Sequence, residues 1–475
     1  RQGGSATGAE AFVCRERASL VREVKISEIL QWTDADLVGI LDPDSAPMAV
    51  ATDSRSVGKD ELFVALKGEH FDGHDFVATA FARGACAALV ARGWDGLERG
   101  AAGPLLAVDS TLMALGAMAR AYRRRCDLPV IAVVGSAGKT TTKELIAAVL
   151  GQRYNVLKTV DSENNEIGVP RTLLQLSPDH EAVVLELAAR RVGDIQYLCS
   201  IAEPTIGVLL NIGTAHLEFF QSVEGVAKAK GELLDYLGES LTALVNADDR
   251  VVVQEVQRTK GRLLTFGFVR ESGFRGEGLV LDQEGCGHFL LHNNPIELKI
   301  PGRHNAYNGL AAASIGRILD VDWEDIQHAL AQFEPVSMRA EIVRKDGLVV
   351  INDCYNANPD SMLAALELLG DVPGARKIAF LGDMLELGPQ SGDLHAAVAA
   401  EVATKADILL ATGKQSKELV AAARSAGMDE TQARHFDNLD LAGEFLSANL
   451  CRGDVVLVKA SRAMAFDRVV ERILQ

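Results

Sequence analysis

Short apolar runs rich in β-branched residues recur along the chain and alternate with alanine-rich stretches at helical spacing. Residues 130–134 read Val-Ile-Ala-Val-Val, which is typical of a strand buried on both faces of a parallel sheet. Similar runs predict further strands at 182–185, 206–210 and 243–245. Because helical stretches separate them, the pattern predicts a central, doubly wound α/β domain, extended by a more β-like segment from about 262 to 300.

Two further α/β segments flank this region. Before it, the runs 62–66 and 87–90 predict strands of a small α/β domain. After it, strands at the spacing of βα units are predicted at 348–351, 377–381, 408–411 and 455–458. The fold class is therefore α/β, with a phosphate-binding central domain and a Rossmann-like C-terminal domain. We expect domains at 25–111, 112–334 and 335–475, behind a disordered extension at 1–24.

Composition and charge narrow the class of protein. A chain of 475 residues is too long for one ordinary core, and 48% hydrophobic with 24% charged residues is typical of globular proteins. The net charge of −17, without a long Lys/Arg run, argues against nucleic acid as a partner. The seven cysteines form no CxxC pair, so neither a disulfide framework nor a zinc site is indicated.

The apolar runs are too short for a membrane span or a signal peptide, and this guides the prediction of localisation. None reaches the roughly 18 residues that a membrane span needs, and the first 24 residues hold no signal-peptide core. We expect a cytoplasmic protein with no membrane partner, and a monomer.

A glycine turn directly follows the predicted strand 130–134 and precedes a predicted helix at 141–150. It reads Gly-Ser-Ala-Gly-Lys-Thr over 135–140. Glycines let successive N–H groups face an anion, and the helix N-terminus adds its dipole. Lys139 can reach the outer phosphates of a nucleotide, and the Thr140 hydroxyl can bind Mg²⁺. Val133 stands where the longer motif has glycine, so this is the shorter GxxGK[ST] form; its place between strand and helix predicts a phosphate site.

Polar residues follow two other predicted strands of the central sheet. Glu186 ends one strand, and His216 follows another, so both are expected at the carboxyl edge of the sheet, where ligands bind. Glu186 is a candidate Mg²⁺ ligand, with an ordinary strand-end carboxylate as the alternative. Lys230 comes fourteen residues after His216, in a predicted helix. No guanine-specifying Asn-Lys-x-Asp tetrad is found, which disfavours a GTPase.

Several segments, in this order, resemble the Mur ligase family. They are GSAGKTTTKE at 135–144, NNEIGVP at 164–170, AHLE at 215–218, AKAKGE at 227–232, PGRHN at 301–305 and DCYNANP at 353–359. The features most similar to the branch that adds D-alanyl-D-alanine are TTKE at 141–144, YNANPDSM at 355–362 and GDMLELG at 382–388. The first domain agrees through TDSR at 52–55 and LFVALKG at 62–68. The resemblance extends from Ile26 to the C-terminus.

The resemblance implies an ATP-dependent, ADP-forming ligase of peptidoglycan precursor synthesis. ATP would phosphorylate the terminal carboxylate of a UDP-N-acetylmuramoyl-tripeptide, and the amine of D-alanyl-D-alanine would then displace phosphate from the acyl phosphate. It also implies two Mg²⁺ ions, one held by Thr140 and the other by Glu186 and His216. Lys230 would complete the second site as a carbamate; a solvated lysine or a direct phosphate contact is the alternative. The residues expected to act in catalysis are Lys139, Glu186, His216 and Lys230.

Carried over by position, the resemblance also implies binding residues for each substrate. Those for ATP are Gly135, Ser136, Ala137, Gly138, Lys139, Thr140 and Thr141, with Asn305 at the adenine, Arg339 at the phosphates, Asp353 at the ribose, and Tyr355 and Asn356 beside the nucleotide. Those for the other substrates are Ser54 and Arg55 for the uridine nucleotide, Asn164 and Asn165 for the muramoyl side, and Asp383, Ser461 and Arg462 for the dipeptide.

Three short segments depart from the family pattern, and two other functions are alternatives to the one that the resemblance implies. The departures are Asp161-Ser162, Glu186-Leu187-Ala188 and Ala460, which concern the placement of substrate more than the type of reaction. The nearest rival function is a Mur ligase that adds a single amino acid, or a folylpolyglutamate synthase. No Asp-Asn-Pro-Arg motif for such an amino acid is found. A nucleotide-binding regulator without catalysis is the rival from another class, and the intact set of polar residues argues against it.

Overall fold

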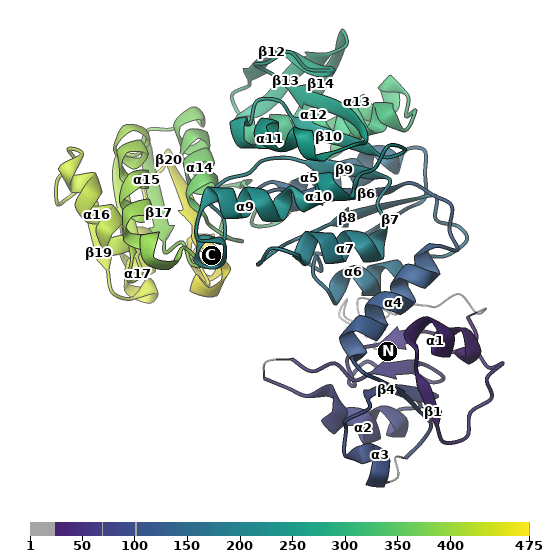
Figure 1. Cartoon of the computed structure of the whole chain (residues 1–475). Coiled ribbons are helices and arrows are strands. Elements are labelled where there is room, and N and C mark those ends of the chain that lie inside the picture. Colours follow the sequence, from purple (N-terminus) through teal and green to yellow (C-terminus); the bar gives the residue numbers. More distant parts are fainter. Residues whose placement is uncertain (1–23, 69, 100–101, 475) are drawn as a thin grey trace, which may run out of the picture. The chain divides into compact units, whose positions relative to one another are not determined.

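The computed structural model describes residues 24–68, 70–99 and 102–474, which form three α/β domains, each on its own sheet (Figure 1). The predicted extension at 1–24 lies outside the described residues except for Val24, which is buried. By the contacts between its residues, the chain divides into two compact units. Of the described residues, one unit holds those up to 131 with 154–187 and 196–204, and the other holds 132–153, 188–195 and 205–474.

The first domain is built on a small five-stranded sheet. Its strands are β1 (Asp36–Val38), β2 (Val50–Ala51), β3 (Leu62–Val64), β4 (Ala87–Ala91) and β5 (Leu105–Val108), in the order β1-β5-β4-β3-β2. Among the described strands of this sheet, β1 alone pairs antiparallel, with β5. Its helices are α1 (Ile26–Thr33), α2 (Val77–Ala82) and α3 (Gly96–Arg99). Phe63, Val77 and Val90 belong to the core of this domain.

The central domain is built on a nine-stranded sheet in the order β14-β13-β12-β11-β10-β9-β6-β8-β7. Its strands are β6 (Val130–Val134), β7 (Val156–Lys158), β8 (Ala182–Glu186), β9 (Ile206–Leu209), β10 (Thr242–Asn246), β11 (Arg262–Gly267), β12 (Phe274–Leu281), β13 (Cys286–Leu291) and β14 (Asn294–Pro301). The predicted doubly wound arrangement is confirmed, with the first strand β6 between β8 and β9. The predicted β-like segment, from about 262 to 300, corresponds to β11, which pairs parallel with β10 and β12, and to the antiparallel run from β12 to β14.

Helices connect the strands of the central domain. They are α4 (Thr111–Arg123), α5 (Lys139–Leu150), α6 (Gly168–Leu173), α7 (Asp194–Ala202), α8 (Leu217–Phe220), α9 (Val223–Lys230), α10 (Glu232–Tyr236), α11 (Arg250–Glu255), α12 (Arg303–Ile318) and α13 (Trp323–Gln332). Helices α5 and α12 pack against each other, and Gly316 lets α12 approach, because a Cβ there would lie 2.6 Å from a methyl group of Val149.

The C-terminal domain has a six-stranded sheet covered on both faces. Its strands are β15 (Glu341–Lys345), β16 (Leu348–Asn352), β17 (Arg376–Gly382), β18 (Ile408–Thr412), β19 (Ala433–Phe436) and β20 (Asp454–Lys459), in the order β15-β16-β20-β17-β18-β19. Its helices are α14 (Pro359–Asp371), α15 (Ser391–Lys405), α16 (Ser416–Ser425), α17 (Leu439–Asn449) and α18 (Asp467–Ile473).

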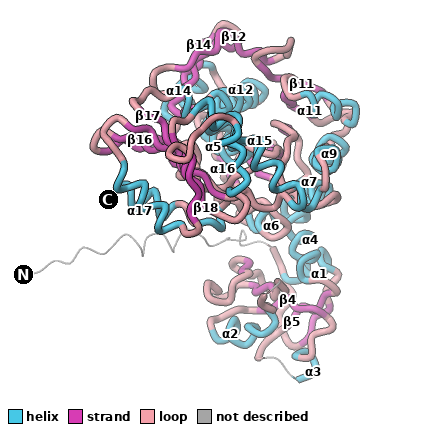
Figure 2. The backbone as a smooth tube through the Cα atoms, turned by 90° about the vertical axis from the view of Figure 1, so that its left-hand side faces the viewer, coloured by secondary structure: helices cyan, strands magenta, loops and turns pink. Residues whose placement is uncertain are grey.

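Alternate residues of the strands in this sheet build two separate cores. Ala379 and Leu381 of β17 face the core formed with α14, α15 and α16, whereas Ile378 and Phe380 face the core formed with α17 and α18. Figure 2 shows the strands between these two layers of helices. Such double coverage explains why these strands read as continuous apolar runs.

No helix within 24–68, 70–99 or 102–474 is long and apolar enough to cross a bilayer.

Candidate nucleotide and metal site

The glycine turn lies between β6 and α5, as the sequence predicts. Gly138 caps α5 with φ +79°, a left-handed conformation that favours glycine, and a Cβ there would lie 2.6 Å from the Asn308 side chain. Helix α5 begins at Lys139, so its N-terminal N–H groups and its dipole lie at the end of the turn. Thr140 and Thr141 are buried in its first turn. The local geometry is that of a phosphate cradle.

Asn211 braces the cradle from the end of β9, a role that the sequence did not reveal. Its Oδ1 accepts hydrogen bonds from the backbone N of Ser136 and of Ala137, both at 2.9 Å. Its Nδ2 donates to the Ala137 carbonyl at 3.1 Å. The Ser136 hydroxyl in turn accepts a bond from the backbone N of Gly213 at 2.9 Å. The first half of the turn is thereby tied to the loop that follows β9.

Lys139 and Lys230 meet at the cradle. Each Nζ donates to the carbonyl oxygen of Gly135, and both distances are 3.0 Å. Lys230 is only 2% exposed, and burial, with a smaller effect from nearby Lys139, lowers its pKa well below the ordinary value. This buried position contradicts the alternative in which Lys230 is a solvated helix residue.

His216 lies in the loop that follows β9, directly before α8, with φ +58°. Its Nδ1 lies 2.5 Å from Oε2 of Glu386, a residue of the C-terminal domain. The hydrogen bond to the imidazole holds the pKa of the Glu386 carboxyl below its usual value. The backbone N of Glu218 donates to the Glu386 carbonyl at 2.9 Å. Glu386 was not among the residues that the sequence singled out for the site.

Glu186 and its partners belong to the other compact unit. Glu186 ends β8 and is 2% exposed. Its Oε1 accepts a hydrogen bond from Asn164 Nδ2 at 2.7 Å, so two residues predicted for the site lie together. Asn165 instead caps the chain before α6, where its Oδ1 accepts from the backbone N of Ile167 and of Gly168.

Four residues predicted at the nucleotide lie near the start of the C-terminal domain. The Arg339 guanidinium lies 3.9 Å from the ring centroid of Tyr355, a cation–π contact. Asp353 accepts from the backbone N of Ala340 at 3.0 Å and from Lys459 Nζ at 2.5 Å. Lys459 also donates to the carbonyl of Asn356, which completes the group.

The Asn305 side chain is hydrogen-bonded to the end of β14 and to α12. Its Nδ2 donates to the Pro301 carbonyl at 2.7 Å, and its Oδ1 accepts from Asn308 Nδ2 at 2.8 Å. Asn308 also accepts from the Thr142 hydroxyl at 3.1 Å, which links α12 to α5. A contact between Asn305 and adenine would therefore share or replace these bonds.

The residues predicted for the dipeptide have different surroundings. Asp383 is buried, and its carboxylate accepts from the backbone N of Gln415 and of Ser416 and from the Ser416 hydroxyl, so it holds the start of α16. The Ser461 hydroxyl accepts from the backbone N of Leu385 at 2.9 Å. Arg462 is exposed and pairs with Asp467 at 3.3 Å.

In the first domain, the predicted uridine-binding residues lie in an exposed turn after β2. Arg55 is paired with Asp53, at 2.7 Å between Nη2 and Oδ2, and Ser54 lies between them in the chain. The exposed pair with the arginine holds the pKa of the Asp53 carboxyl below its usual value.

The donors present fit a hard divalent cation held partly by phosphate. Within the described residues, no three His, Cys, Asp or Glu side chains gather as a metal site. In the compact unit that holds the cradle, the candidate donors are one hydroxyl (Thr140), one imidazole (His216) and the buried amine of Lys230, and the carboxylate of Glu186 belongs to the other unit. Magnesium is commonly bound by one or two carboxylates together with substrate phosphates, so this sparse set suits it. The Nδ1 contact with Glu386 leaves Nε2 as the ring nitrogen of His216 that is open to a metal ion.

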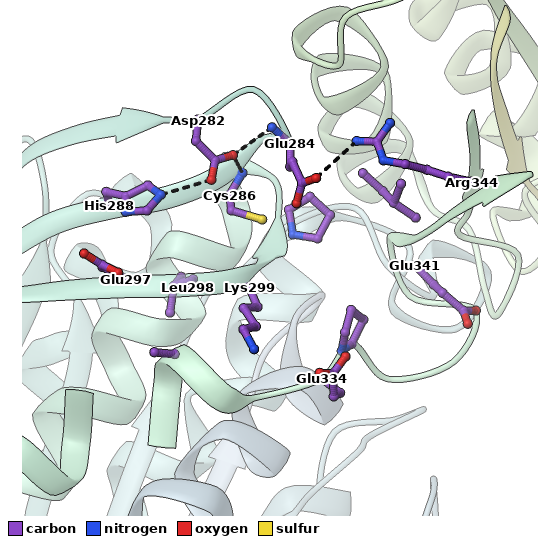
Figure 3. Close-up of a pocket in the computed structure, with 14 residues that line it drawn as sticks. Asp282, Glu284, Cys286, His288, Glu297, Leu298, Lys299, Glu334, Glu341 and Arg344 are labelled. Carbon is purple, nitrogen blue, oxygen red and sulfur yellow. Dashed lines mark hydrogen bonds and ion pairs between the residues drawn. The ribbon is translucent and has the colours of Figure 1, made fainter. Parts of the chain in front are cut away.

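A separate cavity of about 710 Å³ lies beside the β12–β14 segment and β15 (Figure 3). In it Asp282 faces His288 at 3.1 Å, and Glu284 faces Arg344 at 3.7 Å. None of the residues predicted for the nucleotide, the metal or the other substrates lines it. The cavity is distinct from the cradle.

Family models match most of the chain. The Mur ligase middle domain matches residues 133–316, and the Mur ligase glutamate ligase domain matches 338–462. The catalytic domain of the Mur ligase family matches 48–123. These matches include the cradle, His216 and Lys230.

Individual relatives match over nearly their whole length. A UDP-N-acetylmuramoyl-tripeptide--D-alanyl-D-alanine ligase of Synechocystis is 39% identical over 433 residues, which cover 90% of this chain and 91% of the relative. The crystal structure of MurF from Acinetobacter baumannii has a TM-score of 0.87 at 30% identity and covers 96% of this chain and 100% of that chain. MurF ligase from Thermotoga maritima in complex with ADP has a TM-score of 0.79 at 31% identity, covering 89% and 96%. With matches of this extent, the chain belongs to the Mur ligase family.

Proposed function

We propose that the protein is an ATP-dependent, ADP-forming ligase that adds D-alanyl-D-alanine to UDP-N-acetylmuramoyl-tripeptide in peptidoglycan precursor synthesis. The observation that carries the chemistry is the cradle, where Lys139 and the buried Lys230 meet at the Gly135 carbonyl beside the start of α5. The choice of substrates is supported by the named activity of relatives that match 90–95% of the chain.

The first step transfers the γ-phosphoryl group of ATP to the terminal carboxylate of the tripeptide. Two anions must approach, so the residues at the cradle act by neutralising charge and by positioning. The N-terminus of α5 binds phosphate oxygens through its N–H groups, and the Lys139 ammonium stabilises the charge on the transferred group. The D-alanyl-D-alanine amine then attacks the acyl phosphate, an amide bond forms, and phosphate leaves.

Two Mg²⁺ ions would supply further charge neutralisation when bound, one at Thr140 and the other at Glu186, His216 and Lys230. A lysine suits such a site only after its charge is removed, because an ammonium repels a dication. Burial favours the neutral amine of Lys230, which is the form that adds to CO₂, and the carbamate so formed has the anionic oxygens that Mg²⁺ prefers.

The remaining residues are assigned to substrates by domain. The first domain (25–111) would bind the uridine nucleotide through Ser54 and Arg55, and the central domain (112–334) would bind ATP. The C-terminal domain (335–475) would add Arg339, Asp353, Tyr355 and Asn356 to the nucleotide site and bind the dipeptide. The structure supports Arg462 for the dipeptide carboxylate, because it is exposed and has a bidentate fork. Asp383 and Ser461 would support the loops around it. The enzyme would act as a monomer in the cytoplasm.

An assay of phosphate release from ATP tests the assignment of the two substrates directly. Release from ATP is expected only when UDP-N-acetylmuramoyl-tripeptide and D-alanyl-D-alanine are both present. Parallel reactions replace the dipeptide with single amino acids, or both substrates with a folate and glutamate. Equal phosphate release in either parallel reaction would reject the D-alanyl-D-alanine assignment.

A further inference from the structure

The loop that carries His216 is contacted by two carboxylates of the C-terminal domain. Asp360, in the first turn of α14, accepts from the backbone N and the hydroxyl of Thr214 through Oδ2, at 2.6 and 2.9 Å. Glu386 contacts the His216 imidazole and, through its carbonyl, the backbone N of Glu218. Gly213 permits the approach, since a Cβ there would lie 2.1 Å from the Asp360 carboxylate.

Glu386 is presented by a loop that is held at each preceding residue. The Asp383 carboxylate is bound to the start of α16, and the backbone N of Met384 donates to the buried His395 at 2.9 Å. The backbone N of Leu385 donates to Ser461. Glu386 itself has φ +61°, and both its carbonyl and its side chain contact the central domain. A loop so fully bonded is suited to fix a side chain within the tolerance that a metal site requires.

The two ring nitrogens of His216 thereby receive different roles. A carboxylate 2.5 Å from Nδ1 accepts its proton, which selects the tautomer whose Nε2 carries the lone pair. A metal-binding imidazole is commonly oriented by such an outer carboxylate.

We propose that Glu386 is a positioning residue that orients His216 for the metal, so the C-terminal domain completes the metal site of the central domain. This inference rests on the proposed function, because it takes His216 to be a metal ligand. Asp360 has a separate role: it docks the domain on Thr214 and leaves the imidazole untouched. The segment 382–388, which includes Asp383 of the proposed dipeptide site, thus also supports the metal site.

The test compares metal affinity in four forms of the full-length protein. Mn²⁺ is titrated into protein that holds ADP, and free Mn²⁺ is followed by its EPR signal. Glu386→Ala is expected to weaken Mn²⁺ binding by about 10–100-fold, the usual effect of losing a partner of a metal-bound histidine. Glu386→Gln is expected to fall between Glu386→Ala and the wild type, because its amide oxygen can still accept from Nδ1. Asp360→Ala should retain wild-type affinity.

A second measurement needs no metal. The imidazole ¹⁵N shifts of His216, assigned with His216→Gln, are expected to show a protonated Nδ1 in the wild type and a loss of this preference in Glu386→Ala. Unchanged Mn²⁺ affinity and unchanged ¹⁵N shifts in Glu386→Ala would overturn the inference. Equal weakening in Asp360→Ala would also overturn it, since domain docking would then explain the effect. Failure of the wild type itself to bind Mn²⁺ beyond its ADP would instead reject the metal role of His216 in the proposed function.

Discussion

Lys139 and Lys230 donate to the same carbonyl oxygen, that of Gly135, and each does so at 3.0 Å. Two ammonium groups so close would repel each other strongly in a buried site. Burial disfavours the charge on Lys230, which leaves Lys139 as the cation of the pair. Lys139 is thus suited to bind phosphate, and Lys230 is suited to be modified to a carbamate.

Removal of the Lys139 side chain should slow the chemical step. Lys139→Ala is expected to lower turnover by about 10²–10³, as when one preorganised charge donor is lost. Lys228→Ala changes an exposed lysine of α9 and serves as the matched control. Steady-state phosphate release measures both variants. Near-normal turnover in Lys139→Ala would show that Lys139 does not act at the phosphates.

A free carboxylate should partly restore the activity of a variant that lacks the Lys230 side chain. Lys230→Ala removes the group that would become the carbamate, so activity is expected to be lost. Formate or acetate should restore a part of it, because a small acid can enter the vacated space and supply oxygen donors. The same acids should not stimulate Lys139→Ala. Unchanged activity in Lys230→Ala would reject its metal role.

Thermal stability should depend on pH through Lys230. The folded pKa lies below the ordinary value of 10.5, so between these two values the unfolded chain binds a proton that the folded chain does not. Stability therefore rises with pH across this window and is lowest below the folded pKa. The melting temperature of the wild type, relative to Lys230→Met, should rise as the pH approaches 10.5 in CO₂-free buffer without nucleotide. A constant difference would show that the pKa of Lys230 is not shifted.

Asn211 should control the affinity for nucleotide. Asn211→Leu removes three hydrogen bonds from the cradle, each with a net value of about 0.5–1.5 kcal/mol. If the loop loses its shape, the Kd for ADP should rise at least about tenfold, which corresponds to about 1.4 kcal/mol. Calorimetric titration with ADP measures the change, and Asn449→Leu, an exposed position, is the control. An unchanged Kd would mean that the turn keeps its geometry without Asn211.

Gly213 should be coupled to Asp360. Gly213→Ala places a methyl group against the Asp360 carboxylate, so the contact with Thr214 should break and activity should fall. Addition of Asp360→Ala removes the clash and should cost less than the sum of the two single changes. A double-variant cycle on kcat/KM tests this. Strict additivity would show that the two residues do not interact in solution.

Most of the strands that the sequence predicted are covered on both faces. Runs such as 130–134 and 455–458 are central in their sheets and apolar throughout, so composition alone identifies β6 and β20. The strands β1, β7 and β19 lie at the edges of their sheets, are short, and include partly exposed residues. Half-exposed edges lack a continuous apolar run and therefore escaped prediction.

The residues of the candidate site likewise fall into those that the sequence could identify and those that it could not. The cradle from Gly135 to Thr140 could be identified because its strand, turn and helix are adjacent in the chain. Asn211 could not, since an asparagine after a strand has no distinctive local pattern and its bonds reach back 74 or 75 residues. Asp383 and Ser461 were expected at the dipeptide, yet both bond to loops of their own domain.

By itself, the sequence determined three α/β domains and one phosphate cradle, because hydrophobic periodicity and a glycine turn are local properties of the chain. Only the tertiary structure decided that Lys230 shares the Gly135 carbonyl with Lys139, and that His216 meets Glu386 from 170 residues away. Such contacts depend on how packed helices and loops place distant side chains, and the pKa of Lys230 depends in turn on that burial. The residues of the cradle are adjacent in the sequence, whereas the polar side chains around it come together only in the folded chain.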